Sequence, residues 1–323
     1  MIGRALKQAV RDRWVHAARG AASAGLALAF GACNFRLGNS QQSIKMRAAL
    51  VMQVVINTSM LAMVKSLNGL PRESAVVRQE IAAARAGGRN GAYGYLPYFA
   101  SKITVETPID ACFPLIFGAI VAPMAGLQSG TRRLGLLGTV ALQSIAASSL
   151  GLSIGALVGR AETALAIGPP TLVLAIMLAD TEFAPVPAQL KPFASLSLVK
   201  HAYRGAMASE LPGLRFDALT AAPMASTSED GGGGAGGGGL LARFNRSRER
   251  RASAAAAEAM SLKTGEAVME ALGIADATVG GAAKAQLAII AFNIATALAA
   301  LHLKAPGRGR PLPFDPLLQP PSP

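Results

Sequence analysis

The chain has 323 residues, of which 51% are hydrophobic and only 15% are charged, and its mean hydropathy is +0.38. An average soluble domain carries about 25% charged residues, so this composition excludes an ordinary soluble enzyme. The three histidines and two cysteines lie far apart in the sequence, which excludes a zinc site. A net charge of +13 fits either nucleic acid or an anionic membrane surface, and the positions of the charges decide between them.

Long stretches without a charged residue are the most informative feature of the sequence. Six intervals hold 16 to 26 consecutive uncharged residues, namely 20–35, 48–64, 111–131, 134–159, 163–179 and 285–303. A membrane-spanning helix needs about 20 mainly apolar residues, with a range of about 17–25. Three intervals meet this requirement easily, two lie at its lower limit, and the first is marginal. Lipid admits only helices and closed barrels, so we expect an all-α integral membrane protein with six transmembrane helices.

Small residues recur at helical spacing within the fourth interval. Gly151, Gly155 and Gly159 lie four residues apart and therefore share one helix face. Such a small-xxx-small pattern lets two helix backbones approach closely in a membrane. We therefore expect this face to pack against a neighbouring helix.

The first 19 residues read as an amphipathic helix that lies on the membrane surface. Its apolar face carries Ile2, Leu6, Val10 and Trp14, and basic residues occupy the other faces. An organelle transit peptide is also rich in Arg and poor in acidic residues, so that alternative stays open. Asp12 and the apolar interval that follows at once argue against it.

Lysine and arginine are unevenly divided between the two ends of the expected helices. Fifteen lie at 1–19, 65–102, 160 and in the tail after 303, against five in the short segments of the other side. Because cytoplasmic loops carry the excess, both termini are predicted to be cytoplasmic. The resulting segments are transmembrane helices 1–5 within 20–180, a cytoplasmic loop at 65–102, an extracellular or lumenal loop at 181–283, a sixth helix at 284–304, and a cytoplasmic Pro-rich tail at 305–323.

The basic residues flank membrane segments instead of forming one stripe, which argues against nucleic acid as a partner. The tract RFNRSRERR at 243–251 is the exception, but aromatic residues are nearly absent from it. The Gly-rich insert at 230–239 lacks the lysine of a phosphate-binding loop and reads as a flexible segment. Asn245 begins an Asn-Arg-Ser glycosylation acceptor, which is accessible if this loop is extracellular or lumenal.

Residues 71–108 carry an ordered set of motifs, made up of Pro71-Arg72-Glu73, Arg78, Glu80, Tyr93, Tyr98, Lys102, Glu106 and Pro108. Further motifs follow in order at 124–127, 147–151, 196–202, 210–214 and 264–266. Together they resemble the G subfamily of ABC transporters, the white–brown-complex half-transporters, most closely those of plants and algae. The resemblance runs over nearly the whole chain. It implies an ABC-2 type membrane domain of six helices preceded by a surface helix.

The resemblance also implies an ATP-binding domain, which in this family precedes these helices and holds ATP and Mg²⁺. The chain shows no GxxxxGK[ST] loop, no LSGGQ-like signature and no Walker B strand. We therefore expect no catalysis, cofactor or metal within this chain, and an ATP-binding domain in trans or in a missing N-terminal portion. The ten residues 81–90 form an insert in the loop that touches that domain in the family, which puts coupling in question.

In the family, the substrate cavity lies on a dimer axis and is lined by helices two and five. Position counting from the motifs implies that Asn57, Met60, Val173 and Ile176 line it. An Asn at mid-membrane is costly unless it meets a partner or a water-filled cavity, and Met adapts to varied apolar ligands. The alternative is that all four residues merely pack helices together.

Coupling to ATP hydrolysis is implied for Arg78, Glu80, Lys102 and Glu106. Glu80 resembles an intracellular glutamate of the family, and the insert after it is able to displace it. Lys102 and Glu106 lie four residues apart and can pair on one helix face. A solvated pair at the membrane interface is the alternative interpretation.

The favoured function is the membrane-spanning half of an ABC exporter that moves an amphipathic or lipid-like substrate by alternating access. It would act as a homo- or heterodimer within membrane lipid, in a plasma or organelle membrane. The alternative is a truncated, non-transporting relative that pairs with a full half-transporter and regulates it. A membrane-embedded enzyme would need clustered His, Asp or Glu, which the six intervals essentially lack.

Overall fold

A computed structural model describes residues 13–86, 95–181, 186–217 and 264–303, and its regular elements are all helices. Their bounds are α2 Arg13–Cys33, α3 Gln41–Ala86, α4 Tyr95–Ala125, α5 Thr131–Val158, α6 Ala161–Met177, the 3-10 turn Ala188–Leu190, α7 Lys191–Ala194, α8 Leu198–Glu210, α10 Gly265–Ala271 and α11 Val279–Leu303. Within these ranges, the β pairing is limited to one isolated bridge between Arg215 and Thr264. The predicted all-α architecture is confirmed.

Within the described residues, four helices are long and apolar enough to cross a membrane. Their apolar stretches are Gln41–Pro71 of α3, Phe99–Ala125 of α4, Thr131–Val158 of α5 and Val279–Leu303 of α11. Helix α6 is equally apolar but has only 17 residues. Helices α2 and α6 occupy the first and fifth of the expected positions. Each predicted interval is therefore helical, although only four of the described helices meet the length and hydropathy requirement for a membrane span.

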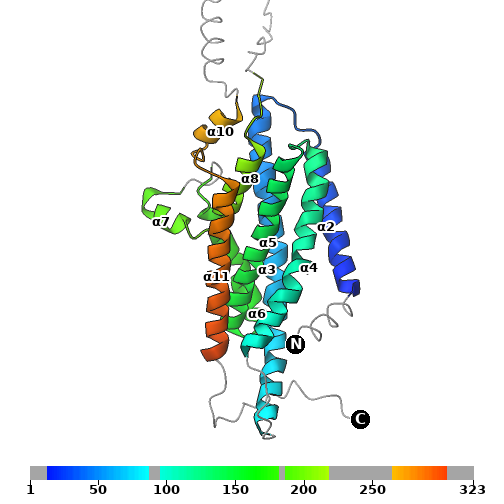
Figure 1. The fold of residues 1–323 in the computed structure, drawn as a ribbon, viewed down its shortest axis with the longest axis vertical. Coiled ribbons are helices and arrows are strands. Elements are labelled where there is room, and N and C mark those ends of the chain that lie inside the picture. The colour runs from blue at the N-terminus through cyan, green and yellow to red at the C-terminus, as the bar shows by residue number, and fades with distance from the viewer. Residues whose placement is uncertain (1–12, 87–94, 182–185, 218–263, 304–323) are drawn as a thin grey trace, which may run out of the picture.

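Helix α5 lies at the centre of the upright bundle and packs against α3, α4, α8 and α11 (Figure 1). Gly151 explains its close approach to α3, because a Cβ there would lie 2.8 Å from the Met63 carbonyl oxygen. Gly155 continues this contact against Pro71. Gly159 differs from the prediction: it has φ 80° and caps the helix, a left-handed conformation that glycine adopts without steric cost.

The predicted cytoplasmic loop at 65–102 is largely helical in the structure. Helix α3 continues through Pro71 to Ala86, about 22 Å beyond the apolar stretch, and extends below the rest of the bundle in Figure 1. Helix α4 begins at Tyr95, well before the third uncharged interval. The physical reason is that charged residues such as Arg and Glu, which end a membrane span, are good helix formers.

The first helix shows no break where the surface segment 1–19 was expected to end. Residues 1–12 lie outside the described part, and α2 runs without interruption from Arg13 to Cys33. It packs along α4, where a Cβ on Gly31 would come within 2.7 Å of the Met124 sulfur. Gly20 follows residue 19 but lies inside the helix, and no proline stands nearby, so helix geometry is carried straight into the apolar interval.

Part of the predicted extracellular loop at 181–283 belongs to the core. Helix α8 buries Ala202, Tyr203, Ala206 and Met207 against α5, α11 and α3. Its start is capped by Ser197, whose hydroxyl accepts a hydrogen bond from the Lys200 backbone N–H at 3.2 Å. The short helix α7 projects sideways from the bundle (Figure 1).

Candidate functional site

Asn57 and Met60, two of the predicted cavity residues, lie on one strip of helix α3 that the single chain leaves uncovered. Met60 is 36% exposed, Asn57 is half-buried, and Gln53 and Met46 continue the strip toward the start of the helix. These positions are separated by three, four and seven residues, so they share a face. The opposite side of α3 is buried against α5.

Val173, the third predicted cavity residue, is 51% exposed on helix α6. The uncovered strip to which it belongs also contains Ala166, Ile167, Pro170, Leu174 and Met177. Ile176 is half-buried and packs against the core. Helices α3 and α6 meet at Gly168, where a Cβ would lie 2.2 Å from Leu67 Cδ1. The structure thus places Asn57, Met60 and Val173 on uncovered strips of two neighbouring helices, while Ile176 faces inward.

The side chain of Asn57 is unusual within its strip. Its Nδ2 atom is buried, and no described residue accepts a hydrogen bond from it. An unsatisfied buried donor costs about 1–3 kcal/mol, so packing alone gives no reason for an amide here. A polar group near the membrane centre that has no partner among the described residues of its chain is a candidate for contact with a ligand or with another chain.

Polar contacts also cross the interior of the bundle, and the sequence analysis did not single them out. Gln286 Nε2 on α11 donates to Gln143 Oε1 on α5 at 3.0 Å, and Gln143 Nε2 donates to Ser59 Oγ on α3 at 2.8 Å. Asn293 Nδ2 on α11 donates to Ser149 Oγ on α5 at 3.2 Å. The sequence feature that could have identified these residues is an uncharged amide side chain inside an apolar interval, since such amides join helices in membranes.

Five charged side chains from α2, α3 and α4 form a connected network of ion pairs. Lys65 Nζ lies 2.5 Å from Glu106 Oε2 and 2.7 Å from Asp110 Oδ2. Lys102 Nζ binds the other Glu106 oxygen at 2.5 Å, and Arg19 Nη1 binds Asp110 Oδ1 at 3.2 Å. Two carboxylates are therefore shared by three cations, and Asp110 is only 5% exposed.

This network contains two of the predicted coupling residues, Lys102 and Glu106, and adds Arg19, Lys65 and Asp110, which were not predicted to act in coupling. Those three lie at the edges of the uncharged intervals, where they read only as flanking charges. Arg78 and Glu80 lie on the extension of α3, and their side chains are outside the described part of the structure. Asn245, the glycosylation candidate, also lies outside the described residues.

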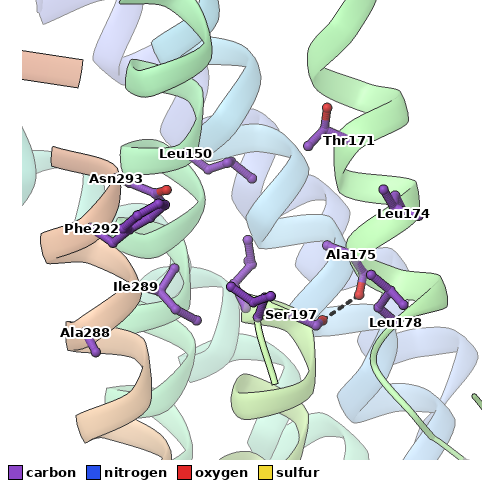
Figure 2. A pocket seen from close by; sticks show the side chains of 12 residues that line it. Leu150, Thr171, Leu174, Ala175, Leu178, Ser197, Ala288, Ile289, Phe292 and Asn293 are labelled. Carbon is purple, nitrogen blue, oxygen red and sulfur yellow. Dashed lines mark hydrogen bonds between the residues drawn. The ribbon is translucent and has the colours of Figure 1, made fainter. Parts of the chain in front are cut away.

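A cavity of about 420 Å³ lies between α6 and α11, with α5 behind it and the start of α8 at one end (Figure 2). It is lined by Leu150, Thr171, Leu174, Ala175, Leu178, Leu196, Ser197, Leu198, Ala288, Ile289, Phe292 and Asn293. None of the four predicted cavity residues is among them. On α6, the lining residues recur at helical spacing, and Val173 is turned about 100° from Leu174 and about 140–160° from the other three.

Searches against known proteins find relatives that fit this architecture. The family model for the ABC-2 type transporter matches residues 1–211. The chain is 36% identical over 222 residues to ABC transporter G family member 7 of Arabidopsis thaliana, which covers 67% of this chain and 29% of that protein. It is 29% identical over 116 residues to Protein white of Drosophila melanogaster, which covers 35% of this chain and 17% of that protein. The chain thus spans less than a third of the length of these relatives.

These matches agree with the long apolar helices, with the buried amide contacts between them, and with the motifs at 71–108. They identify a transporter domain of an integral membrane protein, not a catalytic domain. The chain belongs to the ABC-2 type transporter family, as a membrane domain of the G type.

Proposed function

We propose that this chain is the membrane-spanning half of a dimeric ABC exporter for an amphipathic or lipid-like substrate. The observation that carries the proposal is the pair of uncovered strips on α3 and α6, which bear Asn57, Met60 and Val173. A single chain leaves these apolar strips unpartnered, and a second half-transporter would cover them and enclose a cavity on the shared axis. Apolar lining with a few polar groups is typical of adaptable sites.

ATP hydrolysis would drive the export from a nucleotide-binding domain outside this sequence, which would also hold ATP and Mg²⁺. We assign the coupling to the cytoplasmic ends of α3 and α4, with Arg78, Glu80, Lys102 and Glu106 as the residues involved. The ion pairs that Lys102, Glu106 and Lys65 make support this, because they fasten α4 to α3 near that end. The excess of Lys and Arg at the same end supports cytoplasmic termini.

Cross-linking tests the dimer axis. In a chain with Cys33→Ser and Cys112→Ser, Met60→Cys should form a disulfide-linked species of about twice the 32.9 kDa monomer mass in native membranes. Leu134→Cys, at another exposed apolar position on α5, is the matched control and should stay monomeric. Cross-linking at position 134 but not at position 60 would refute the proposed axis.

ATPase measurements test the export function. Immunopurified complexes, captured with an antibody to residues 243–262, should hydrolyse ATP faster when fluorescent phosphatidylcholine is added, and should move that lipid across proteoliposome membranes. The activity should require an ATP-binding chain or segment in the complex. Complexes that bind ATP but move no lipid would favour the second candidate, a regulatory relative that pairs with a full half-transporter. The insert at 81–90 is the observation that favours this candidate.

A further inference from the structure

The cavity between α6 and α11 differs from the proposed substrate path. Its lining residues on α6 are Thr171, Leu174, Ala175 and Leu178, which recur every three or four residues and so form one stripe. Val173 is not among them, although Leu174 also belongs to the uncovered strip that carries Val173. At about 420 Å³, the cavity falls within the range of about 300–1,000 Å³ that small-molecule sites occupy. Exposed apolar side chains form its rim, at Leu174, Leu196 and Phe292, so it opens toward the lipid.

The hydroxyl groups of this cavity have already used their hydrogens. Thr171 Oγ1 donates to the Ile167 carbonyl at 2.9 Å, and Ser197 Oγ donates to the Ala175 carbonyl at 2.5 Å, which Figure 2 marks with a dashed line. Asn293 uses one of its two amide N–H groups toward Ser149. The cavity therefore presents oxygen lone pairs and at most one neutral N–H to a ligand.

The orientation of the Asn293 amide follows from its partner. The Ser149 hydroxyl donates its single hydrogen to the Ala146 carbonyl at 2.7 Å, so it can only accept from Asn293. The Asn293 nitrogen must face Ser149, and the carbonyl oxygen must point the other way. Asn293 is 5% exposed, and among the described residues no donor reaches that oxygen. A 95% buried side chain thus lines the cavity with an unused acceptor.

These observations select one class of ligand. A carboxylate or phosphate would find at most the second N–H of Asn293, and an ammonium would find no lining carboxylate, so burial of either charge would be uncompensated. A hydroxyl group on an apolar body matches both the apolar walls and the free acceptor. We propose that this cavity binds a neutral membrane lipid whose polar group is a hydroxyl, with Asn293 Oδ1 accepting the hydroxyl hydrogen. The site is independent of the proposed export function.

The test uses the full chain in nanodiscs of dimyristoylphosphatidylcholine, which carries no free hydroxyl. Trp14→Phe removes the only native indole, and Phe292→Trp places an indole at the rim of the cavity. The probes are 11-bromoundecan-1-ol and its methyl ether, since bromine quenches indole fluorescence and only the alcohol donates a hydrogen bond. The alcohol should quench saturably, with an affinity about three- to tenfold tighter than that of the ether.

Two variants locate the effect at the acceptor. Asn293→Leu should bring the two affinities together, whereas Thr296→Val, at a half-buried position one turn along α11, should leave their ratio unchanged. If Asn293→Leu does not fold, the difference in affinity between the alcohol and the ether, measured on protein that retains Asn293, still tests the proposal. Equal affinities there would overturn the proposal. Absence of saturable quenching by either probe would overturn it too, and would indicate that a second polypeptide fills the cavity.

Discussion

Arg47 and Glu210, which are 163 residues apart in the sequence, form an ion pair in which both side chains are only 2% exposed. Arg47 Nη1 lies 2.5 Å from Glu210 Oε1, and Arg47 Nη2 donates to the Leu37 carbonyl at 2.9 Å. The second Glu210 oxygen accepts from the Gln128 backbone N–H at 3.0 Å. One pair therefore ties the α2–α3 connection, the α4–α5 connection and the end of α8 together.

Breaking this pair should destabilise the fold strongly. Glu210→Ala leaves Arg47 charged and buried, and removal of one partner from a buried pair costs about 3–5 kcal/mol. We expect the apparent Tm of the detergent-purified chain to fall by many degrees. The double variant Arg47→Met with Glu210→Leu should recover much of the loss, because it removes both buried charges. A double variant as unstable as Glu210→Ala would show that the charges themselves are required.

Close packing of α5 against α3 predicts opposite effects for two glycines on one helix. Gly151→Ala would place a Cβ 2.8 Å from the Met63 carbonyl oxygen, and overpacking of this kind costs about 1–3 kcal/mol. Gly138→Ala is the matched control, since nothing lies within 4 Å of its Cβ. It should be neutral or should stabilise by about 0.5–1 kcal/mol, because alanine favours the helix. Thermal unfolding of both variants checks the contrast, which equal destabilisation would contradict.

Lys65 is the cation that joins both carboxylates of the α2–α3–α4 network. Lys65→Gln should destabilise by an amount between the about 0–1 kcal/mol of an exposed pair and the about 3–5 kcal/mol of a buried pair, because the network is partly exposed. Lys45→Gln, at an exposed position on the same helix, is the control and should change the unfolding temperature little. A similar Tm for both variants would show that the ion-pair network does not contribute to stability.

Replacement of Asn57 should change stability and ATPase activity in opposite directions, which distinguishes a functional role from a packing role. Asn57→Leu removes a buried donor without a described partner and should stabilise the chain by up to about 1–3 kcal/mol. The same change should lower lipid-stimulated ATPase activity of the assembled transporter, because it removes a polar group from the proposed cavity. Unfolding temperature and ATPase rate are measured on the same preparation. Reduced stability with unchanged activity would indicate that Asn57 is a packing residue.

The loop after α6 should respond to acid through Asp180. A hydrogen bond from the Val186 backbone N–H holds the pKa of Asp180 below its usual value, and Lys200 lowers it further, against a smaller opposing effect of burial. A depressed pKa means that the stabilisation is present above the unfolded-state pKa and is lost as the pH falls through the folded-state value. Backbone amide exchange near Val186 should therefore accelerate below about pH 4.

Asp180→Asn is the matched variant for this acid response. It keeps an oxygen acceptor and tolerates the observed φ of 51°, but it carries no charge. Its amide exchange should lack the acid-dependent acceleration once the intrinsic pH dependence of exchange is subtracted. An identical acid response in both proteins would exclude Asp180 as its source.

Local sequence was sufficient to predict the helical class, the membrane environment and the positions of the apolar helices. These depend on hydrophobic length and on the absence of charge, which each interval carries within itself. The family motifs at 71–108 depend on residue identity alone, and the comparisons confirm the family that they indicate. That Asn57 and Met60 share one helix face also followed from helical spacing, whereas the structure showed that this face is uncovered.

Only the tertiary structure decided which distant residues meet. Arg47 with Glu210, Gln286 with Gln143, and Lys65 with Asp110 are separated by 163, 143 and 45 residues, and nothing in helical periodicity relates them. The same holds for burial of α8 within a stretch that reads as a loop, and for the acceptor that Asn293 presents between α6 and α11. The physical reason is that a buried polar group needs a partner, but the chain topology determines which residue is close enough to be that partner.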